Sequence, residues 1–308
     1  MKSFEAICPV YNEEKTIPLF FERLQGVFDV LRTKYDCRLT FIDNGSTDKS
    51  QELVKELCAK YEWVSHIVMS RNFGYQSSIE CGVRNSNADY TGFVDVDCED
   101  PPEMFIEFMK HIESGYDVAY GERLDRPEPW VVKMLRKIFY RVTRATADER
   151  FILDMAEFSL MSRMVRDAIC RDNNSFPFIR ASIGRVGFDI KNVPYTRHKR
   201  IAGETHYNMR GMVIFAVAGI LSSSTLWLRI PVYLFPIWFL ISILGLVAFA
   251  LTENELYYKL VATTGLMFIA FTLTGISLYL ARVYKNGLGR PNYIVNVKKS
   301  TVRGRPVT

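Results

Sequence analysis

The sequence lacks the cysteine spacing and the glycine-rich loops that mark several large classes of protein. Its six cysteines form no Cys-x-x-Cys pair and all precede residue 200. We therefore expect no zinc site and no disulfide framework, and we interpret the cysteines as reduced thiols in a cytosolic compartment. Neither a Gly-x-x-x-x-Gly-Lys stretch nor a Gly-x-Gly-x-x-Gly stretch follows the first apolar run. P-loop enzymes and dinucleotide oxidoreductases are disfavoured for that reason.

A net positive charge is also lacking over most of the chain. The 308 residues carry a net charge of +5, but from Arg229 onward nine Lys and Arg stand against two acids, which leaves residues 1–228 slightly acidic. A general nucleic-acid binder needs a basic face on its folded domain, so we exclude nucleic acid as a partner. An acid within the first five residues and a charged helix soon after argue against a signal peptide.

Two long segments without charge lie near the C-terminus, at 230–252 and 260–281. Each is long enough to cross a hydrocarbon core of about 30 Å as a helix, and the short link between them predicts an antiparallel pair. A buried hairpin in a soluble core is the alternative. Because Lys and Arg flank the outer ends, we expect a multi-pass protein of the inner (plasma) membrane with both termini in the cytoplasm.

A further uncharged segment, 211–228, is shorter and contains four consecutive hydroxyl residues. We favour an interfacial helix over a third span, because three spans would place the basic tail outside. Within the two spans, Gly245, Gly265 and Gly275 allow close helix packing, which leaves a homo-oligomer such as a tetramer open.

Short apolar runs alternate with amphipathic stretches before residue 200. This alternation predicts a mostly parallel sheet covered by helices on both faces. The expected strands are 4–10, 38–42, 66–69, 90–94 and 118–120, and the expected helices are 13–32, 48–61, 75–86 and 102–114. We divide the chain into an α/β domain at 1–208, a juxtamembrane interfacial helix at 209–229, a two-helix transmembrane hairpin at 230–283 and a basic cytoplasmic tail at 284–308.

Polar residues follow several of the apolar runs, at the edge where parallel α/β sheets bind ligands. Asp95, Asp97 and Glu99 alternate along one extended segment, so their carboxylates are expected to face one point. Hard oxygen ligands suit Mg²⁺ or Mn²⁺, which share their coordination with water and with substrate phosphates. A solvated Asp-x-Asp loop is the alternative. The cations available for a phosphate are Arg71, Arg123, Arg126, Arg197, Lys199 and Arg200.

Five motifs occur in the order seen in glycosyltransferase family 2. They are CPVYNEE at 8–14, DNGSTD at 43–48, SRNFG at 70–74, DVDCEDPPE at 95–103 and RIAGET at 200–205. With the two trailing spans, the chain resembles the polyprenyl-phosphate glycosyltransferases, the group of the bactoprenol glucosyltransferases and dolichol-phosphate mannose synthases. The resemblance extends over essentially the whole sequence.

The resemblance implies a GT-A catalytic domain and the transfer of one sugar, with inversion, from a nucleotide diphosphate sugar to a polyprenyl phosphate. UDP-hexose and undecaprenyl phosphate are the expected substrates, and they meet at the cytoplasmic face of the membrane. The product would be a lipid-phosphate-sugar donor for the modification of cell-surface glycans. The resemblance also implies a metal-dependent hexosyltransferase that uses Mg²⁺ or Mn²⁺.

Roles for individual residues follow from the same resemblance. Asp95, Asp97 and Glu99 would hold the metal and the diphosphate. Asp154 and Glu157 lie in a stretch whose family acid stands at the reacting centre, and either would orient the acceptor or the metal. The catalytic set is Asp97, Asp154, Glu157 and Arg200. The nucleotide- and phosphate-binding set is Pro9, Tyr11, Glu13, Asp43, Asp95, Arg71, Arg123, Arg126, Thr205 and His206.

Four positions depart from the family pattern. Glu99 replaces a glutamine, Glu157 an aspartate, Ser159 an arginine and His206 a lysine. The loss of cations weakens phosphate binding, whereas the added carboxylate at residue 99 strengthens metal binding. Two other functions therefore stay open: transfer to another lipid or glycan acceptor, and a catalytically silent membrane scaffold.

Overall fold

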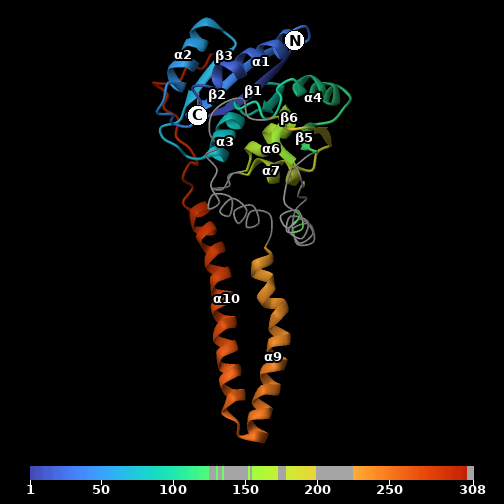
Figure 1. Ribbon diagram of the computed structural model, residues 1–308, viewed down its shortest axis with the longest axis vertical. Helices are drawn as coiled ribbons and strands as arrows, with labels where there is room; N and C mark the ends of the chain where they lie inside the picture. The colour runs from blue at the N-terminus through green and yellow to red at the C-terminus, as the bar shows by residue number, and fades with distance from the viewer. Residues whose placement is uncertain are drawn as a thin grey trace.

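The computed structural model describes residues 1–124, 130, 134, 152, 155–172, 178–198 and 225–303. Within these ranges an α/β domain is joined to two long helices that project from one side of it (Figure 1). The interfacial helix expected at 209–229 lies almost wholly outside the described residues.

A seven-stranded sheet forms the centre of the domain, in the order β3-β2-β1-β4-β6-β5-β7. The strand β6 runs antiparallel to its neighbours β4 and β5, and the other pairs are parallel. This mixed, mostly parallel sheet confirms the expected GT-A-like architecture. The strands are β1 (Lys2–Val10), β2 (Tyr35–Asp43), β3 (Val64–Val68), β4 (Tyr90–Phe93), β5 (Val118–Arg123), β6 (Met155–Ser162) and β7 (Ile190–Tyr195).

Helices cover both faces of the sheet, as the strand-helix alternation predicts. One face carries α1 (Ile17–Leu31), α2 (Ser50–Lys60) and α4 (Met104–Glu113), and the other carries α3 (Tyr75–Asn85), α6 (Arg163–Cys170) and α7 (Ile179–Val186). The first face is rich in phenylalanine: the Phe105 ring packs edge-on against Phe4 at 5.1 Å and against Phe158 at 5.4 Å. Burial of each such ring stabilises the fold by about 1.5–3 kcal/mol.

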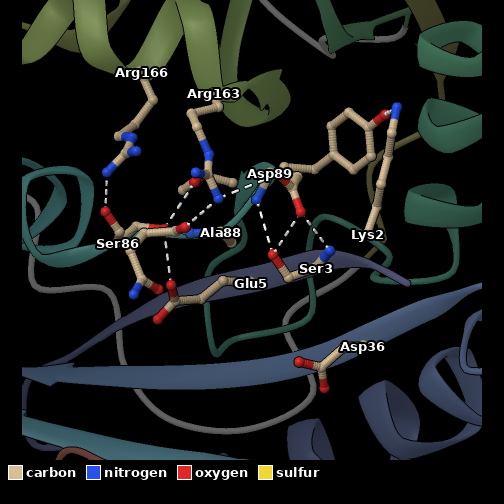
Figure 2. Close-up of polar contacts among 12 residues, drawn as sticks. Lys2, Ser3, Glu5, Asp36, Ser86, Ala88, Asp89, Arg163 and Arg166 are labelled. Atoms are coloured by element: carbon tan, nitrogen blue, oxygen red, sulfur yellow. Dashed lines mark hydrogen bonds and ion pairs between the residues drawn. The ribbon is translucent and has the colours of Figure 1, made fainter. Parts of the chain in front are cut away.

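The amino-terminal ends of the strands are held by a polar network (Figure 2). The buried carboxylate of Glu5 accepts hydrogen bonds from Thr40 Oγ1 at 2.5 Å and from Ser86 Oγ at 2.8 Å. Nearby, Asp89 Oδ2 accepts from the backbone N–H of Ser3 at 2.8 Å and from its hydroxyl at 2.9 Å. These contacts join β1 to the loop after α3. They lie away from the carboxyl ends of the parallel strands, where a ligand is expected.

The two projecting helices are α9 (Leu226–Thr252) and α10 (Glu255–Gly287), and both are long and apolar enough to cross a membrane. They extend the predicted spans by a few residues at their ends. The span glycines serve contacts inside this hairpin: a Cβ at Gly245 would lie 2.6 Å from Val261, and one at Gly275 would lie 3.3 Å from the backbone of Trp227. Trp238 also stacks on Phe268 with ring centroids 5.3 Å apart.

The chain after α10 returns to the domain and lies along β3 (Figure 1). His66 and Thr301 exchange two backbone hydrogen bonds of 2.8 and 2.7 Å, and Met69 and Val295 form a second antiparallel bridge. Tyr293, Val295 and Val302 pack against the core on the α3 side of the sheet. The expected basic tail is therefore, as far as Arg303, a docked edge segment, which we call the tail segment (288–303).

Candidate active site

The loops that follow β1 and β2 hold one another through side-chain hydrogen bonds. Ser46 Oγ accepts from the backbone N–H of Asn12 at 3.0 Å, and Asn12 Oδ1 accepts from the N–H of Thr47 at 2.8 Å. The N–H of Ser46 in turn donates to Asp43 Oδ1 at 2.7 Å. Asn12 adopts a left-handed backbone conformation, with φ of 56°. The two expected nucleotide-binding loops thus form one unit.

The loop after β3 completes this unit. Asn44 Oδ1 accepts from the N–H of Phe73 at 2.8 Å, and Asn44 Nδ2 donates to Asn72 Oδ1 at 3.1 Å. The exposed guanidinium of Arg71 stacks on the Phe73 ring at 3.9 Å from its centroid. Three consecutive strand ends therefore present one continuous polar surface.

Of the expected nucleotide residues, Pro9, Glu13 and Asp43 are buried and Tyr11 is half-buried. Asp43 Oδ2 lies 3.9 Å from Nε2 of the buried His66. Within the described residues, neither this oxygen nor the ring nitrogens of His66 form a hydrogen bond. Buried polar groups of folded proteins are nearly always paired, so these three atoms are exceptions within the described part of the domain.

Carboxylates gather where β4 ends and β6 begins. Phe93 pairs with Ser159 in the antiparallel register, so Asp95 and Glu157, each two residues beyond, lie at the same edge. Tyr75 Oη donates to Asp95 Oδ1 at 2.8 Å. Burial, together with the charges of Asp97, Asp100 and Glu157, raises the pKa of Asp95 to about 7. This edge is therefore rich in negative charge and favours a cation.

Asp97 and Glu99 lie in a tight turn around Cys98, whose φ is 55°. Asp97 Oδ1 accepts from the N–H of Glu99 at 3.0 Å, and the Glu99 carboxylate forms an ion pair with Arg197. Across the described part of the chain, no three His, Cys, Asp or Glu side chains form a group that could hold a metal ion. Asp95, Asp97 and Glu99 thus share an edge without converging as a complete ligand set.

Asp100 is the carboxylate that Arg123 neutralises. Arg123 Nη2 lies 2.9 Å from Asp100 Oδ2, and Tyr195 Oη donates to Asp100 Oδ1 at 2.5 Å. Arg123 Nε also donates to Tyr195 Oη at 3.1 Å. Burial opposes the charge on Arg123, but Asp100 and Tyr195 outweigh it and raise the pKa of this guanidinium. This triad fastens the turn after Asp97 to β5 and β7.

Glu157 has two partners that the sequence analysis did not identify. Gln76 Nε2 donates to Glu157 Oε1 at 2.8 Å, and Arg180 Nη2 forms an ion pair with Glu157 Oε2. Gln76 lies in the first turn of α3 and Arg180 in the first turn of α7, so both reach the edge from helix ends. No spacing in the sequence relates either residue to Glu157. The remaining expected residues, which are Asp154, Arg126, Arg200, Thr205 and His206, lie outside the described residues.

The chain is similar to known glycosyltransferases over nearly its whole length. The family model described as Glycosyl transferase family 2 matches residues 5–172. The uncharacterized glycosyltransferase YkcC of Bacillus subtilis (strain 168) is 33% identical over 304 residues, which cover 95% of this chain and 93% of that protein. The prophage bactoprenol glucosyl transferase homolog of Escherichia coli (strain K12) is 27% identical over 305 residues, which cover 95% and 98%.

One solved structure with a similar fold is glucosyl-3-phosphoglycerate synthase from Mycobacterium tuberculosis in complex with Mn²⁺, UDP and phosphoglyceric acid. Its TM-score is 0.49 at 15% sequence identity, over 71% of this chain and 76% of that one.

Proposed function

The chain belongs to glycosyltransferase family 2, and from that premise we propose that it transfers one hexose, with inversion, from UDP-hexose to a polyprenyl phosphate. The observation that carries this proposal is the meeting of Asp95 and Glu157 at one sheet edge, beside the linked loops after β1, β2 and β3. The Escherichia coli relative, named a bactoprenol glucosyl transferase homolog, supports undecaprenyl phosphate as the acceptor. The product would serve as a sugar donor for cell-surface glycans.

The nucleotide part of the donor is assigned to the linked loops. Pro9, Tyr11 and Glu13 lie at the end of β1, and Asp43 Oδ2, which has no hydrogen bond within the described residues, is assigned to a donor group of the nucleoside. Arg71 stands exposed at the rim, where a charged phosphate is accessible to it.

The residues after β4 fit a divalent cation. Asp95 and Asp97 supply hard oxygen atoms in a place where carboxylates outnumber nearby cations, and Mg²⁺ and Mn²⁺ complete their coordination with water and substrate phosphate. Glu99 would join them only after leaving Arg197. When bound, such an ion supplies positive charge to the diphosphate that departs.

The acceptor needs little activation. A phosphate monoester has its second pKa near about 6, so the polyprenyl phosphate is largely a dianion at neutral pH. One of its oxygens forms a bond to the anomeric carbon, the bond from that carbon to the diphosphate oxygen breaks, and the electron pair leaves with the nucleotide diphosphate. No proton has to move, so the side chains of this edge act by positioning and by charge.

The two apolar helices account for the lipid acceptor. They place the domain at a membrane surface, and the positive charges that flank them favour the cytoplasmic face of the inner membrane. The head group of a polyprenyl phosphate is found at the same surface. The domain can therefore reach the acceptor head group while the lipid chain stays in the membrane.

The metal assignment is tested by Asp97→Ala. We expect transfer to fall by about 100-fold or more, because charge stabilisation of the leaving group is lost. The matched control is Asp36→Ala, since Asp36 lies at the opposite end of the strands, beside Ser3 (Figure 2), and forms an ion pair with its neighbour Arg38 at 2.6 Å. Transfer is measured in detergent with Mn²⁺ present. An Asp97→Ala enzyme that keeps its activity under these conditions would refute the assignment.

A further inference from the structure

Arg180 occupies a position that neither the sequence motifs nor the proposed donor site explain. Its side chain is 25% exposed, and its guanidinium reaches Glu157 from the first turn of α7. Nε of Arg180 is buried and, within the described residues, has no hydrogen-bond partner. A buried N–H of a cation without an acceptor is costly, so this group is suited to an acceptor that arrives with a ligand.

The other described arginines of this edge are more fully engaged. Arg123 is held by both Asp100 and Tyr195, and Arg197 contacts both Glu99 and Asp100. Among the carboxylates of the described residues, Arg180 forms an ion pair with Glu157 alone. A guanidinium whose Nε–H lacks an acceptor favours an added anion, and a phosphate with three acceptor oxygens meets that need.

Arg180 reaches this edge from one face of the sheet. Asp95 and Asp97 occupy the end of β4, whereas Arg180 lies on the face of the sheet covered by α3, α6 and α7. Figure 1 shows that this face is turned toward α9 and α10. A phosphate carried by a membrane lipid would approach from that direction. The nucleotide sugar is soluble, so it is not restricted to the membrane side.

We propose that Arg180 binds the phosphate of the lipid acceptor, and that Glu157 and Gln76 are positioning residues that hold its guanidinium. This assignment rests on the proposed function. During transfer the acceptor oxygen that bonds to the anomeric carbon comes from the phosphate that Arg180 holds through its other oxygens, and no proton is exchanged with Glu157. Gln76 links Glu157 to the start of α7, because its Nε2 donates to Glu157 and its Oε1 accepts from the N–H of Ile179 at 3.5 Å.

The test compares Arg180→Gln and Arg180→Lys with Arg185→Gln in the full-length protein. Arg185 lies on the same helix but pairs with Asp172. Initial rates are measured in detergent while undecaprenyl phosphate and UDP-hexose are varied in turn. We expect Arg180→Gln to raise the acceptor KM at least tenfold with the donor KM within twofold, Arg180→Lys to recover part of the loss, and Arg185→Gln to change neither.

Glu157→Gln provides the test of positioning. Its acceptor KM should rise less than that of Arg180→Gln, and the double variant should be no worse than Arg180→Gln alone, because both act through one guanidinium. An increase in the donor KM with an unchanged acceptor KM in Arg180→Gln would overturn the assignment. If the wild-type protein transfers no sugar to undecaprenyl phosphate from any donor, the proposed function itself fails. Should Arg180→Gln not fold, Arg180→Lys alone decides between these outcomes.

Discussion

At the scale of single residues, Gly45 shows how closely the loops after β2 and β3 approach one another. A Cβ at this position would lie 2.8 Å from the backbone carbon of Arg71 and 2.9 Å from the backbone nitrogen of Asn72, and the φ of 78° disfavours any side chain. We expect Gly45→Ala to lower the free energy of unfolding by about 1–3 kcal/mol and to raise the donor KM, because the loops must separate. Thermal unfolding and donor titration measure the two effects.

Gly26→Ala is the matched control for this substitution. Gly26 is exposed in the middle of α1, and a Cβ there would meet nothing within 4 Å. Alanine should stabilise the helix by about 0.5–1 kcal/mol and leave the donor KM unchanged. If Gly45→Ala behaves like Gly26→Ala, the close approach of the loops does not matter for nucleotide binding.

The ionisation of Asp89 makes the stability of the protein depend on pH. The backbone N–H of Ser3, with smaller contributions from the Ser3 hydroxyl and Arg163, holds the pKa of Asp89 below its usual value (Figure 2). A lowered pKa means that the stabilisation is present above the unfolded value of about 3.9 and is lost as the pH falls through the folded value. Asp89→Asn should therefore lower the melting temperature at pH 7, and the difference from wild type should shrink below about pH 4. A constant difference across that range would contradict this account.

The sequence identifies some site residues and misses others for a physical reason. Asp43, Asp95 and Asp97 were predictable because each follows an apolar run, and parallel strands end at a common edge. Arg180 and Gln76 belong to helices whose apolar periodicity indicates only which face is buried. Their contacts with Glu157 depend on tertiary packing, which the sequence pattern does not indicate. The role of Glu99 is also altered by packing, because Arg197 from beyond β7 reaches it.

At the scale of elements, the tail segment connects the second long helix to the site. It pairs with β3, and the N–H of Ser70, directly after that strand, donates to Ile294 O at 2.8 Å. Asn292 also donates to Glu80 on α3 at 2.8 Å, and α3 carries Tyr75 and Gln76 in its first turn. The segment thus braces both the loop after β3 and the helix that touches Asp95 and Glu157.

Thr301→Pro removes the N–H that donates to His66 O at 2.7 Å. We expect a loss of about 1–3 kcal/mol in stability and an increase in the donor KM, since β3 leads into the loop that contains Arg71. Thr301→Ala keeps the N–H and should have little effect on either quantity. Equal behaviour of the two variants in thermal unfolding and in donor titration would show that the tail pairing is dispensable.

Within the α/β domain, elements before residue 124 were more predictable than those after it. The five expected strands and four expected helices were confirmed, because each has an apolar period of its own. Apolar and polar residues alternate from 156 to 160, which is typical of a strand with one solvated face, but both faces of β6 are buried, so the pattern does not indicate that Glu157 and Ser159 lie inside the domain. The antiparallel direction of this strand, which brings Glu157 to the site, likewise has no local signal.

At the scale of the whole molecule, the two apolar helices and the docked tail set the relation between domain and membrane. Both helices were predictable from uncharged length, whereas the return of the tail was not, because its backbone pairing with β3 depends on tertiary structure. The face with α3, α6 and α7 is turned toward the helices, and it carries Arg180 (Figure 1). The proposed acceptor residue therefore lies on the side of the sheet from which a membrane lipid would approach.

The most direct test of the central claim is transfer from a panel of radiolabelled nucleotide sugars to undecaprenyl phosphate in detergent, with Mg²⁺ or Mn²⁺ and with EDTA. We predict an acid-labile glycolipid from one donor, most readily a UDP-hexose, that forms with the metal and is abolished by EDTA. The absence of product from every donor, in a folded protein that still binds a nucleotide, would contradict the proposed glycosyl transfer.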